Sequence, residues 1–250
     1  MVSLERALSK LGVASRGEAK RWIEAGRIRV DGRPAEHPLQ PVNPDRARIE
    51  VDGVRVRKAG SITIAMHKPV GYVTTRSDEL GRRTVYDLLP PETPFVTPIG
   101  RLDFESSGLL LLTNDSRMSD RITTPGACVK VYEVEVDRPL TDEICSEFRK
   151  GMHMQNDERL APVEVDLDPA DPRRARLLLR EGRNRQIRRM CGERGYVVTK
   201  LHRTAVGPIL LGDLAEGGVR TLVTSEVDSL HGSLGSAPGA RRATSSRPGS

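Results

Sequence analysis

Residues 130–136, KVYEVEV, alternate apolar and polar side chains over the length of one β-strand, a pattern typical of a strand with one buried face. Other segments with the period of a strand or a helix follow in an irregular order. One strand begins at Ser61, further strands are expected at 175–180 and 220–223, and helices are expected at 115–122 and 141–150. This irregular order predicts an α+β fold with a mainly antiparallel, mixed sheet flanked by helices, and disfavours a doubly wound parallel sheet.

The first 56 residues have a pattern of their own and predict a small α/β domain. Leucines at helical spacing indicate one short helix, and Ser15 with Glu18 three residues later predicts a capping box at the start of a second. Two alternating segments then end in Asp31-Gly32 and Asp52-Gly53, which are typical hairpin turns.

The remaining chain divides by composition. We expect a linker at 57–61, where the sequence is basic and contains glycine, and a second, larger domain over 62–228. Residues 229–250 are rich in Gly, Ser, Ala, Pro and Arg, which predicts a disordered tail. The acidic, proline-bearing segment 157–172 has no function that the sequence indicates.

The positive charge is concentrated. The net charge is +6, and residues 173–203 carry eleven Lys or Arg against two Asp or Glu. Residues 1–60 are also basic, with thirteen against eight. Such focused charge is typical of a surface that binds phosphates, although a solvated basic face is the simpler alternative.

The cysteines indicate a protein of a reducing compartment, and the spacing of the cysteines and histidines indicates that the protein has no metal site. Cys128, Cys145 and Cys191 are far apart, and none of the five histidines lies at ligand spacing from them. No apolar run approaches the roughly 18 residues needed to span a membrane. We therefore expect a soluble cytoplasmic protein with no metal and no membrane contact.

The segment 100–108, GRLDFESSG, is the first candidate for a working centre. Its single aspartate, Asp103, follows Arg101 and precedes an apolar run, and glycines on both sides allow close approach of other backbone. A carboxylate in such a turn is a candidate catalytic acid. An Arg and an Asp in a turn also commonly form only a weak surface pair.

The second candidate is the basic segment 180–191, REGRNRQIRRMC. Asn184 is a favourable N-cap, and the apolar spacing beginning at Ile187 predicts a helix behind it. Arg185 and Arg188, three residues apart, would then lie on neighbouring sides of its first turn. A rigid arginine there could pair with a buried carboxylate or with phosphate oxygens; an exposed helix face is the alternative.

The first 55 residues resemble the ribosomal-protein-S-four-type RNA-binding domain. The "ASRGEA" corner and the "GRIRVDG" strand carry the likeness. The resemblance implies that this unit grips structured RNA through its shape and phosphates. The residues expected to contact RNA are Arg16, Lys20, Arg21, Arg27 and Arg29.

Four further segments resemble the RsuA/RluB/RluF class of ribosomal RNA pseudouridine synthases. They are HKPVGYVTT at 67–75, GRLDFESSGLLLLTND at 100–115, KVYEVEV at 130–136 and EGRNRQIRRMCGERGYVVTKLHRTAVG at 181–207. The likeness extends over about residues 2–225 and includes the order of the two domains.

The resemblance implies roles for individual residues. Asp103 would be the essential aspartate, Tyr132 the active-site tyrosine that stacks on the uracil, and Arg188 the ion-pair partner of Asp103, with Arg185 as the alternative partner. Arg101 would help to hold the target nucleotide out of its helix. The remaining residues expected to bind substrate are Leu102, Asn184, Arg185 and Ile187.

The implied reaction is the isomerisation of uridine to pseudouridine in a nucleotide flipped out of a stem-loop. Asp103 would either attack C1′ of the ribose or remove the C2′ proton to give a glycal, and the sequence leaves both routes open. No cofactor is expected. The implied substrate is ribosomal RNA, in particular the large-subunit RNA or its precursor, bound by a monomer.

Two other classes of protein share some of these features. A non-catalytic RNA-binding or ribosome-assembly factor on the same scaffold would have the basic surfaces, but it would not need Asp103, Tyr132 and an arginine to converge. A nucleoside hydrolase would also place a carboxylate at C1′, but it would not need the N-terminal RNA-binding unit.

Overall fold

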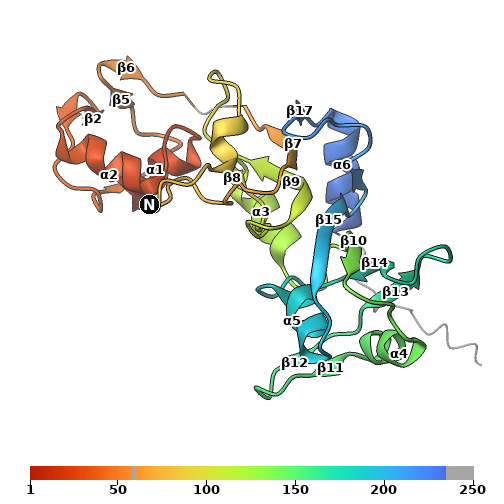
Figure 1. The fold of residues 1–250 in the computed structure, drawn as a ribbon. Helices are drawn as coiled ribbons and strands as arrows, with labels where there is room; N and C mark the ends of the chain where they lie inside the picture. The colour runs from red at the N-terminus through yellow and green to blue at the C-terminus, as the bar shows by residue number, and fades with distance from the viewer. Residues whose placement is uncertain (58–59, 235–250) are drawn as a thin grey trace, which may run out of the picture.

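The computed structural model describes residues 1–57 and 60–234. The chain forms a small N-terminal module and a larger module built on one long sheet (Figure 1). The predicted α+β class, with a mainly antiparallel, mixed sheet, is confirmed.

In the N-terminal module, α1 (Leu4–Lys10) and α2 (Arg16–Glu24) meet at a tight corner. The predicted capping box is confirmed: the Glu18 amide donates to Ser15 Oγ at 3.1 Å, and the Ser15 amide donates to Glu18 Oε2 at 3.0 Å. These bonds satisfy amides that the first helical turn leaves without partners.

The helices pack on a four-stranded sheet in the order β3-β2-β5-β6. Asp31 and Asp52 both have positive φ, as do the glycines after them, so both predicted Asp-Gly hairpin turns are present. A separate two-stranded pair, β1-β4, closes the module. The strands are β1 (Val2–Ser3), β2 (Ile28–Val30), β3 (Arg33–Pro34), β4 (Pro41–Val42), β5 (Ile49–Val51) and β6 (Val54–Arg55).

The large sheet runs in the order β13-β14-β10-β15-β9-β7-β17, with β8 pairing β9 and β16 pairing β15. Every pair in it is antiparallel except β15 with β9. The strands are β7 (Thr63–Lys68), β8 (Thr97–Pro98), β9 (Ser107–Thr113), β10 (Lys130–Val136), β13 (Glu164–Leu167), β14 (Arg174–Leu179), β15 (Val198–Val206), β16 (Ile209–Leu210) and β17 (Val219–Thr221).

Strand β9 is buried along its whole length because both of its faces are covered. Leu109 and Leu111 join the core beneath α3 (Ser116–Thr123) and α6 (Thr224–Ser233), whereas Leu110 and Leu112 join the core on the opposite face, beside the 3-10 helix η1 (Val85–Leu88). A continuous apolar run is typical of a strand in this position.

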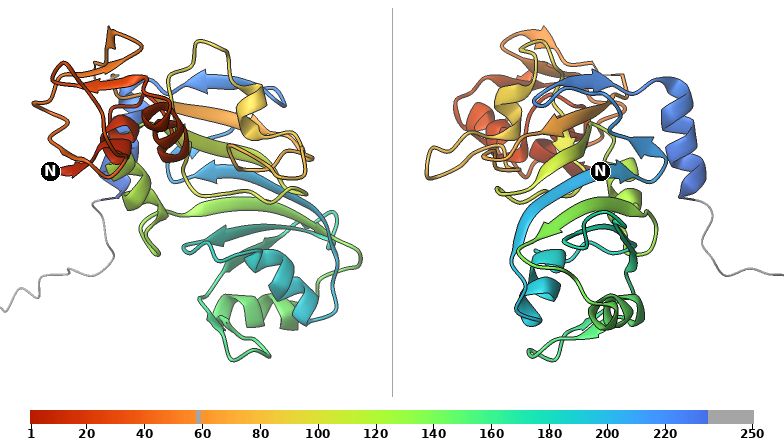
Figure 2. Two further views of the ribbon diagram at one scale, coloured as in Figure 1. Left: turned by 90° about the vertical axis from the view of Figure 1, so that its left-hand side faces the viewer. Right: turned by 45° about the vertical axis from the view of Figure 1, so that its right-hand side comes forward.

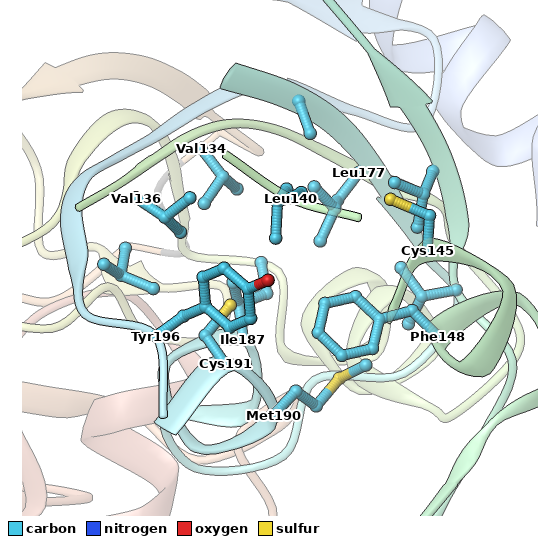
Figure 3. Close-up of a cluster of buried hydrophobic side chains, with 14 of the residues drawn as sticks. Val134, Val136, Leu140, Cys145, Phe148, Leu177, Ile187, Met190, Cys191 and Tyr196 are labelled. Carbon is cyan, nitrogen blue, oxygen red and sulfur yellow. The ribbon is translucent and has the colours of Figure 1, made fainter. Parts of the chain in front are cut away.

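The other half of the sheet carries α4 (Asp142–Lys150) and α5 (Gln186–Glu193). Figure 3 shows Phe148 and Met190 of these helices facing Val134 and Leu177 of the sheet. The long strands β10 and β15 connect the two halves (Figure 2). This packing holds the first turn of α5 near the middle of the sheet, where the candidate site lies.

The predicted tail starts too early. Helix α6 continues to Ser233, and Leu230 within it is fully buried against the core beneath α3. Residues 229–233 are therefore part of the large module. The rest of the predicted tail, 235–250, and residues 58–59 of the predicted linker lie outside the described residues.

Arg76 of the large module contacts the N-terminal module. Arg76 Nε lies 3.0 Å from Glu18 Oε2 of helix α2, and its guanidinium stacks on the rings of Tyr86 and Phe95, 5.0 and 4.9 Å from their centroids. The ion pair and the stacking act on the same planar cation, which arginine allows and lysine does not.

Candidate active site

A cavity of about 340 Å³ opens where the loop before β9 meets the segment before α5. This volume lies in the range of small-ligand sites. Seven of the eight residues predicted to act on or bind the target nucleotide line it: Arg101, Leu102, Asp103, Tyr132, Asn184, Arg185 and Ile187.

Asp103 is held by the backbone around it. Thr74 Oγ1 donates to the Leu102 carbonyl at 2.7 Å and accepts from the Leu102 amide at 3.3 Å, and the Ser106 amide donates to the Asp103 carbonyl at 3.1 Å. The Asp103 side chain keeps 26% of its surface exposed. The loop is therefore fixed while its carboxylate remains open to the cavity.

The cation next to Asp103 is Arg185, so the predicted pairing with Arg188 is wrong. Arg185 Nη1 lies 3.8 Å from Asp103 Oδ2 and 2.8 Å from Glu105 Oε2. Arg188 does not line the cavity; its two terminal nitrogens donate to the carbonyls of Val198 and Glu105, both at 3.0 Å. It is directed to β15 and the loop backbone.

The start of α5 explains this difference. Asn184 is not the N-cap; Arg185 is, and it adopts a left-handed conformation with φ 49° and no side-chain cap bond. The turn is closed instead by Gln186, whose side-chain oxygen accepts from the Arg183 amide at 3.1 Å. Because the helix begins one residue later than predicted, Arg185 is released toward Asp103.

Arg203 of β15 lines the cavity beside Tyr132, and the sequence analysis missed it. The side chain is buried; Nε donates to the Leu109 carbonyl at 2.7 Å and Nη1 donates to the Tyr132 hydroxyl at 3.4 Å. The Arg203 guanidinium therefore orients the tyrosine hydroxyl. The sequence contained one sign of this role: an arginine within the strand-like segment LHRTAV, where a buried apolar residue would be expected.

Lys68 is a second buried cation that the sequence analysis missed. It ends β7, and its Nζ donates to the carbonyls of Pro69 and Ser106 at 2.8 and 2.7 Å. Burial lowers its pKa to about 8, although the nearby negative charge of Asp103 opposes the shift. Lys68 thus ties β7 to the loop that carries the aspartate.

We expect Lys68→Met to destabilise the fold by about 1–3 kcal/mol at pH 7, because two buried carbonyls lose their donor. Between the folded pKa of about 8 and the ordinary lysine pKa of 10.5, the unfolded chain binds a proton that the folded chain does not. Wild-type stability gains from Lys68 as the pH rises through this window. The difference between wild type and variant should therefore grow from pH 8 to 10 in urea unfolding; a constant difference would contradict the assignment.

The five basic residues predicted to contact RNA are all exposed on the N-terminal module. Two of them have acidic partners: Arg27 pairs with Asp52 and stacks on Trp22, and Lys20 lies 3.8 Å from Glu24. Arg16, Arg21 and Arg29 form no ion pair within residues 1–57 and 60–234. They remain available to phosphates.

Metal ligands, membrane-spanning helices and reactive thiols are the other features that could indicate a function. The part of the chain that the structure describes contains no group of three or more metal-ligating side chains. Its helices include none long and apolar enough to cross a membrane. The three cysteines are free and buried, and burial raises the pKa of the Cys191 thiol to about 12, which keeps it protonated.

Comparisons with known proteins identify the family to which the chain belongs. Residues 62–193 match the family model described as RNA pseudouridylate synthase, and residues 3–46 match that of the S4 domain. The chain is 37% identical to ribosomal small subunit pseudouridine synthase A of Pseudomonas aeruginosa, across 91% of this chain and 99% of the relative. It is 32% identical to ribosomal large subunit pseudouridine synthase B of Bacillus subtilis, across 92% and 96%.

A crystal structure of a pseudouridylate synthase superposes on 92% of this chain and 100% of its own, with a TM-score of 0.67 and 25% identity. The family matches, the relatives and the shared fold agree along nearly the whole chain. This chain therefore belongs to the RNA pseudouridine synthase family: it is an enzyme of the RsuA/RluB class, with an S4 domain ahead of its synthase domain.

Proposed function

We propose that the cavity isomerises a uridine of ribosomal RNA to pseudouridine, with Asp103 acting at the ribose. One observation carries the proposal: Asp103 is the only carboxylate among the described residues that line the cavity, and an arginine lies beside it. A carboxylate that faces C1′ can stabilise or trap the positive charge that develops there when the glycosidic bond breaks.

At the ribose, the reaction requires one carboxylate and no external reagent. The bond from uracil N1 to C1′ breaks, a bond from C5 to C1′ forms, and the C5 proton is replaced by one on N1. Asp103 either forms an ester at C1′ or removes the C2′ proton to give a glycal; both routes use the same carboxylate position. Reactant and product have the same atoms and oxidation state, so no cofactor is needed.

Arg185 and Tyr132 complete the proposed site. Arg185 Nη1 lies 3.8 Å from Asp103 Oδ2 and places a positive charge beside the carboxylate. The Tyr132 ring offers a face for the uracil. Its hydroxyl, which accepts a hydrogen bond from Arg203, can relay the C5 proton by passing its own proton to water as it takes up the one from C5. Leu102 and Ile187 supply apolar walls to the cavity, while Arg101 and Asn184 line it toward the RNA.

For Tyr132→Phe, we expect kcat to fall by about 10²-fold with little change in KM, because the ring remains and the hydroxyl is lost. Release of tritium from RNA labelled at uracil C5 measures the step directly. Tyr72→Phe is the matched control: its hydroxyl accepts from Arg83 at 3.3 Å, outside the cavity. An equal loss in both variants would mean that Tyr132 has no specific role.

The proposed substrate is a stem-loop of large-subunit ribosomal RNA, bound by a monomer in the cytoplasm. The sequence of residues 184–201 resembles the synthases that act on large-subunit RNA, and the Bacillus subtilis relative is named for that subunit. The basic residues of the S4 domain and the arginines near the cavity would contact RNA phosphates. The Pseudomonas aeruginosa relative is named for the small subunit, so both RNAs belong in the test.

The deciding experiment maps pseudouridines in both ribosomal RNAs from cells with and without the gene. We expect one large-subunit site to disappear and to return with the wild-type gene. Loss of a small-subunit site instead would overturn the choice of subunit and keep the reaction. No change at any ribosomal site would overturn ribosomal RNA as the substrate.

A further inference from the structure

A hairpin joins β11 (Met152–His153) to β12 (Arg159–Leu160), and β12 lies in the segment 157–172, for which the sequence indicates no function. It lies beside α5 in Figure 1. Met152 and Leu160 are buried in the same core as Ile187 of the helix. The turn between the two strands is closed by the Met154 amide, which donates to the Glu158 carbonyl at 2.9 Å.

The turn presents the Glu158 carboxylate to both ends of the segment 183–189. Oε1 accepts from Arg183 Nη1 at 3.1 Å, and both carboxylate oxygens accept from the terminal nitrogens of Arg189. Arg189 Nε in turn donates to the Asn184 carbonyl at 2.9 Å. One carboxylate therefore binds Arg183, before Arg185, and Arg189, after it.

Arg185 needs such support because its backbone is unfavourable. It is one of four non-glycine residues with positive φ among those described, and such a conformation persists where the surroundings impose it. Its own side chain is directed at Asp103 and Glu105. The conformation of this one residue decides whether its guanidinium reaches the catalytic carboxylate.

A second carboxylate reinforces these contacts. Glu181 Oε1 accepts from Gln186 Nε2 and from the Ala161 amide, both at 2.8 Å. Because Ala161 directly follows β12, the hairpin and the start of α5 are joined on both sides of the turn. These hydrogen bonds connect residues that lie far apart in the sequence, and two of the residues, Arg183 and Gln186, line the cavity.

We propose that Glu158 is a positioning residue, which holds the segment 183–189 so that Arg185 faces Asp103, and which lowers the positive charge of the RNA-facing rim. The inference rests on the proposed function of the cavity. Glu158 contacts neither substrate nor Asp103; it acts through Arg183 and Arg189. Arg183 itself lines the cavity.

Glu158→Gln should therefore change two measured quantities in opposite directions. We expect kcat to fall by about 10- to 100-fold, the range for a misplaced active-site group. RNA affinity should not weaken and should rise by up to about threefold, with a steeper salt dependence, because Arg183 and Arg189 lose their counter-charge. A residue that only stabilised the fold would lower the melting temperature and weaken both.

Glu147→Gln is the matched control. Glu147 of α4 pairs with Arg194, the residue directly after α5, far from the cavity lining. The substitution removes the same charge next to the same helix. We expect unchanged kcat, and the proposal is overturned if both variants lose turnover equally or if Glu158→Gln retains it.

Amide hydrogen exchange gives a readout that does not depend on activity. The Gln186 amide donates to the Arg183 carbonyl at 3.2 Å, and its exchange should accelerate at least tenfold in Glu158→Gln and not in Glu147→Gln. Unchanged exchange would overturn the positioning role. Wild type that forms no pseudouridine would refute the proposed function separately, because the exchange result stands without it.

Discussion

Asp103→Asn is expected to lower turnover by about 10⁴-fold or more, the scale on which loss of an essential active-site carboxylate acts. The amide has nearly the same shape and keeps the loop, whose hydrogen bonds to Thr74 and Ser106 use main-chain atoms of residues 102 and 103. It can neither attack C1′ nor accept the C2′ proton. RNA affinity should stay within about threefold of wild type, because phosphate contacts dominate binding.

The measurement combines single-turnover pseudouridine formation with a binding titration on the same stem-loop. Asp166→Asn, on the exposed side of β13, is the control for loss of one acid and should keep full turnover. Residual turnover of Asp103→Asn within tenfold of wild type would remove Asp103 from the chemistry. Loss of RNA binding together with turnover would instead show that the variant disturbs the surface.

Gly108→Ala has the largest expected effect on stability. Gly108 has φ +107°, and a Cβ built on it would lie 2.2 Å from the Arg203 carbonyl oxygen. These two residues face each other where β9 and β15 pair in parallel. No rotamer change relieves a contact with backbone, so the strands must separate. We expect a loss of at least about 4 kcal/mol, among the largest for single substitutions.

Thermal unfolding tests this prediction, and we expect the Tm to fall by about 8–16 °C. Activity should also be lost, because separation of the strands displaces Arg203. Gly192→Ala in α5 is the control, because its Cβ would meet nothing within 4 Å and its φ is not positive. That variant should be slightly stabilised, by up to about 1 kcal/mol. A Gly108→Ala protein that melts like wild type would mean that the two strands are not this close.

Local patterns predicted much of this fold. The alternation at 130–136 became β10, the run beginning at Leu109 became the buried strand β9, and Ser15 with Glu18 formed the capping box. Each of these depends on residues close in sequence. By contrast, β15 was missed because Arg203 interrupts its apolar pattern. That arginine is buried, and Leu109 and Tyr132, far away in the sequence, accept hydrogen bonds from two of its nitrogens.

The site shows the same division. The sequence placed Asp103 and Tyr132 in one cavity by resemblance, but the choice between Arg185 and Arg188 depends on where α5 begins. Asn184 has the better capping propensity, yet the Gln186 side chain, itself held by Glu181, closes the turn one residue later. Helix α6 was missed because its Gly and Ser residues resemble a tail, while Leu230, with Val227 and Leu234 packed beside it, fixes the helix to the core.

The ion pair between Glu18 and Arg76 joins the S4 domain to the synthase domain. The same carboxylate that caps α2 holds the planar cation that is stacked in the synthase domain. The corner helix that would grip RNA phosphates is thereby linked to the domain that holds the cavity, which would receive the flipped uridine. We therefore expect target choice to depend on a length: among loops with a reachable uridine, those whose stem also reaches the corner helix should be preferred.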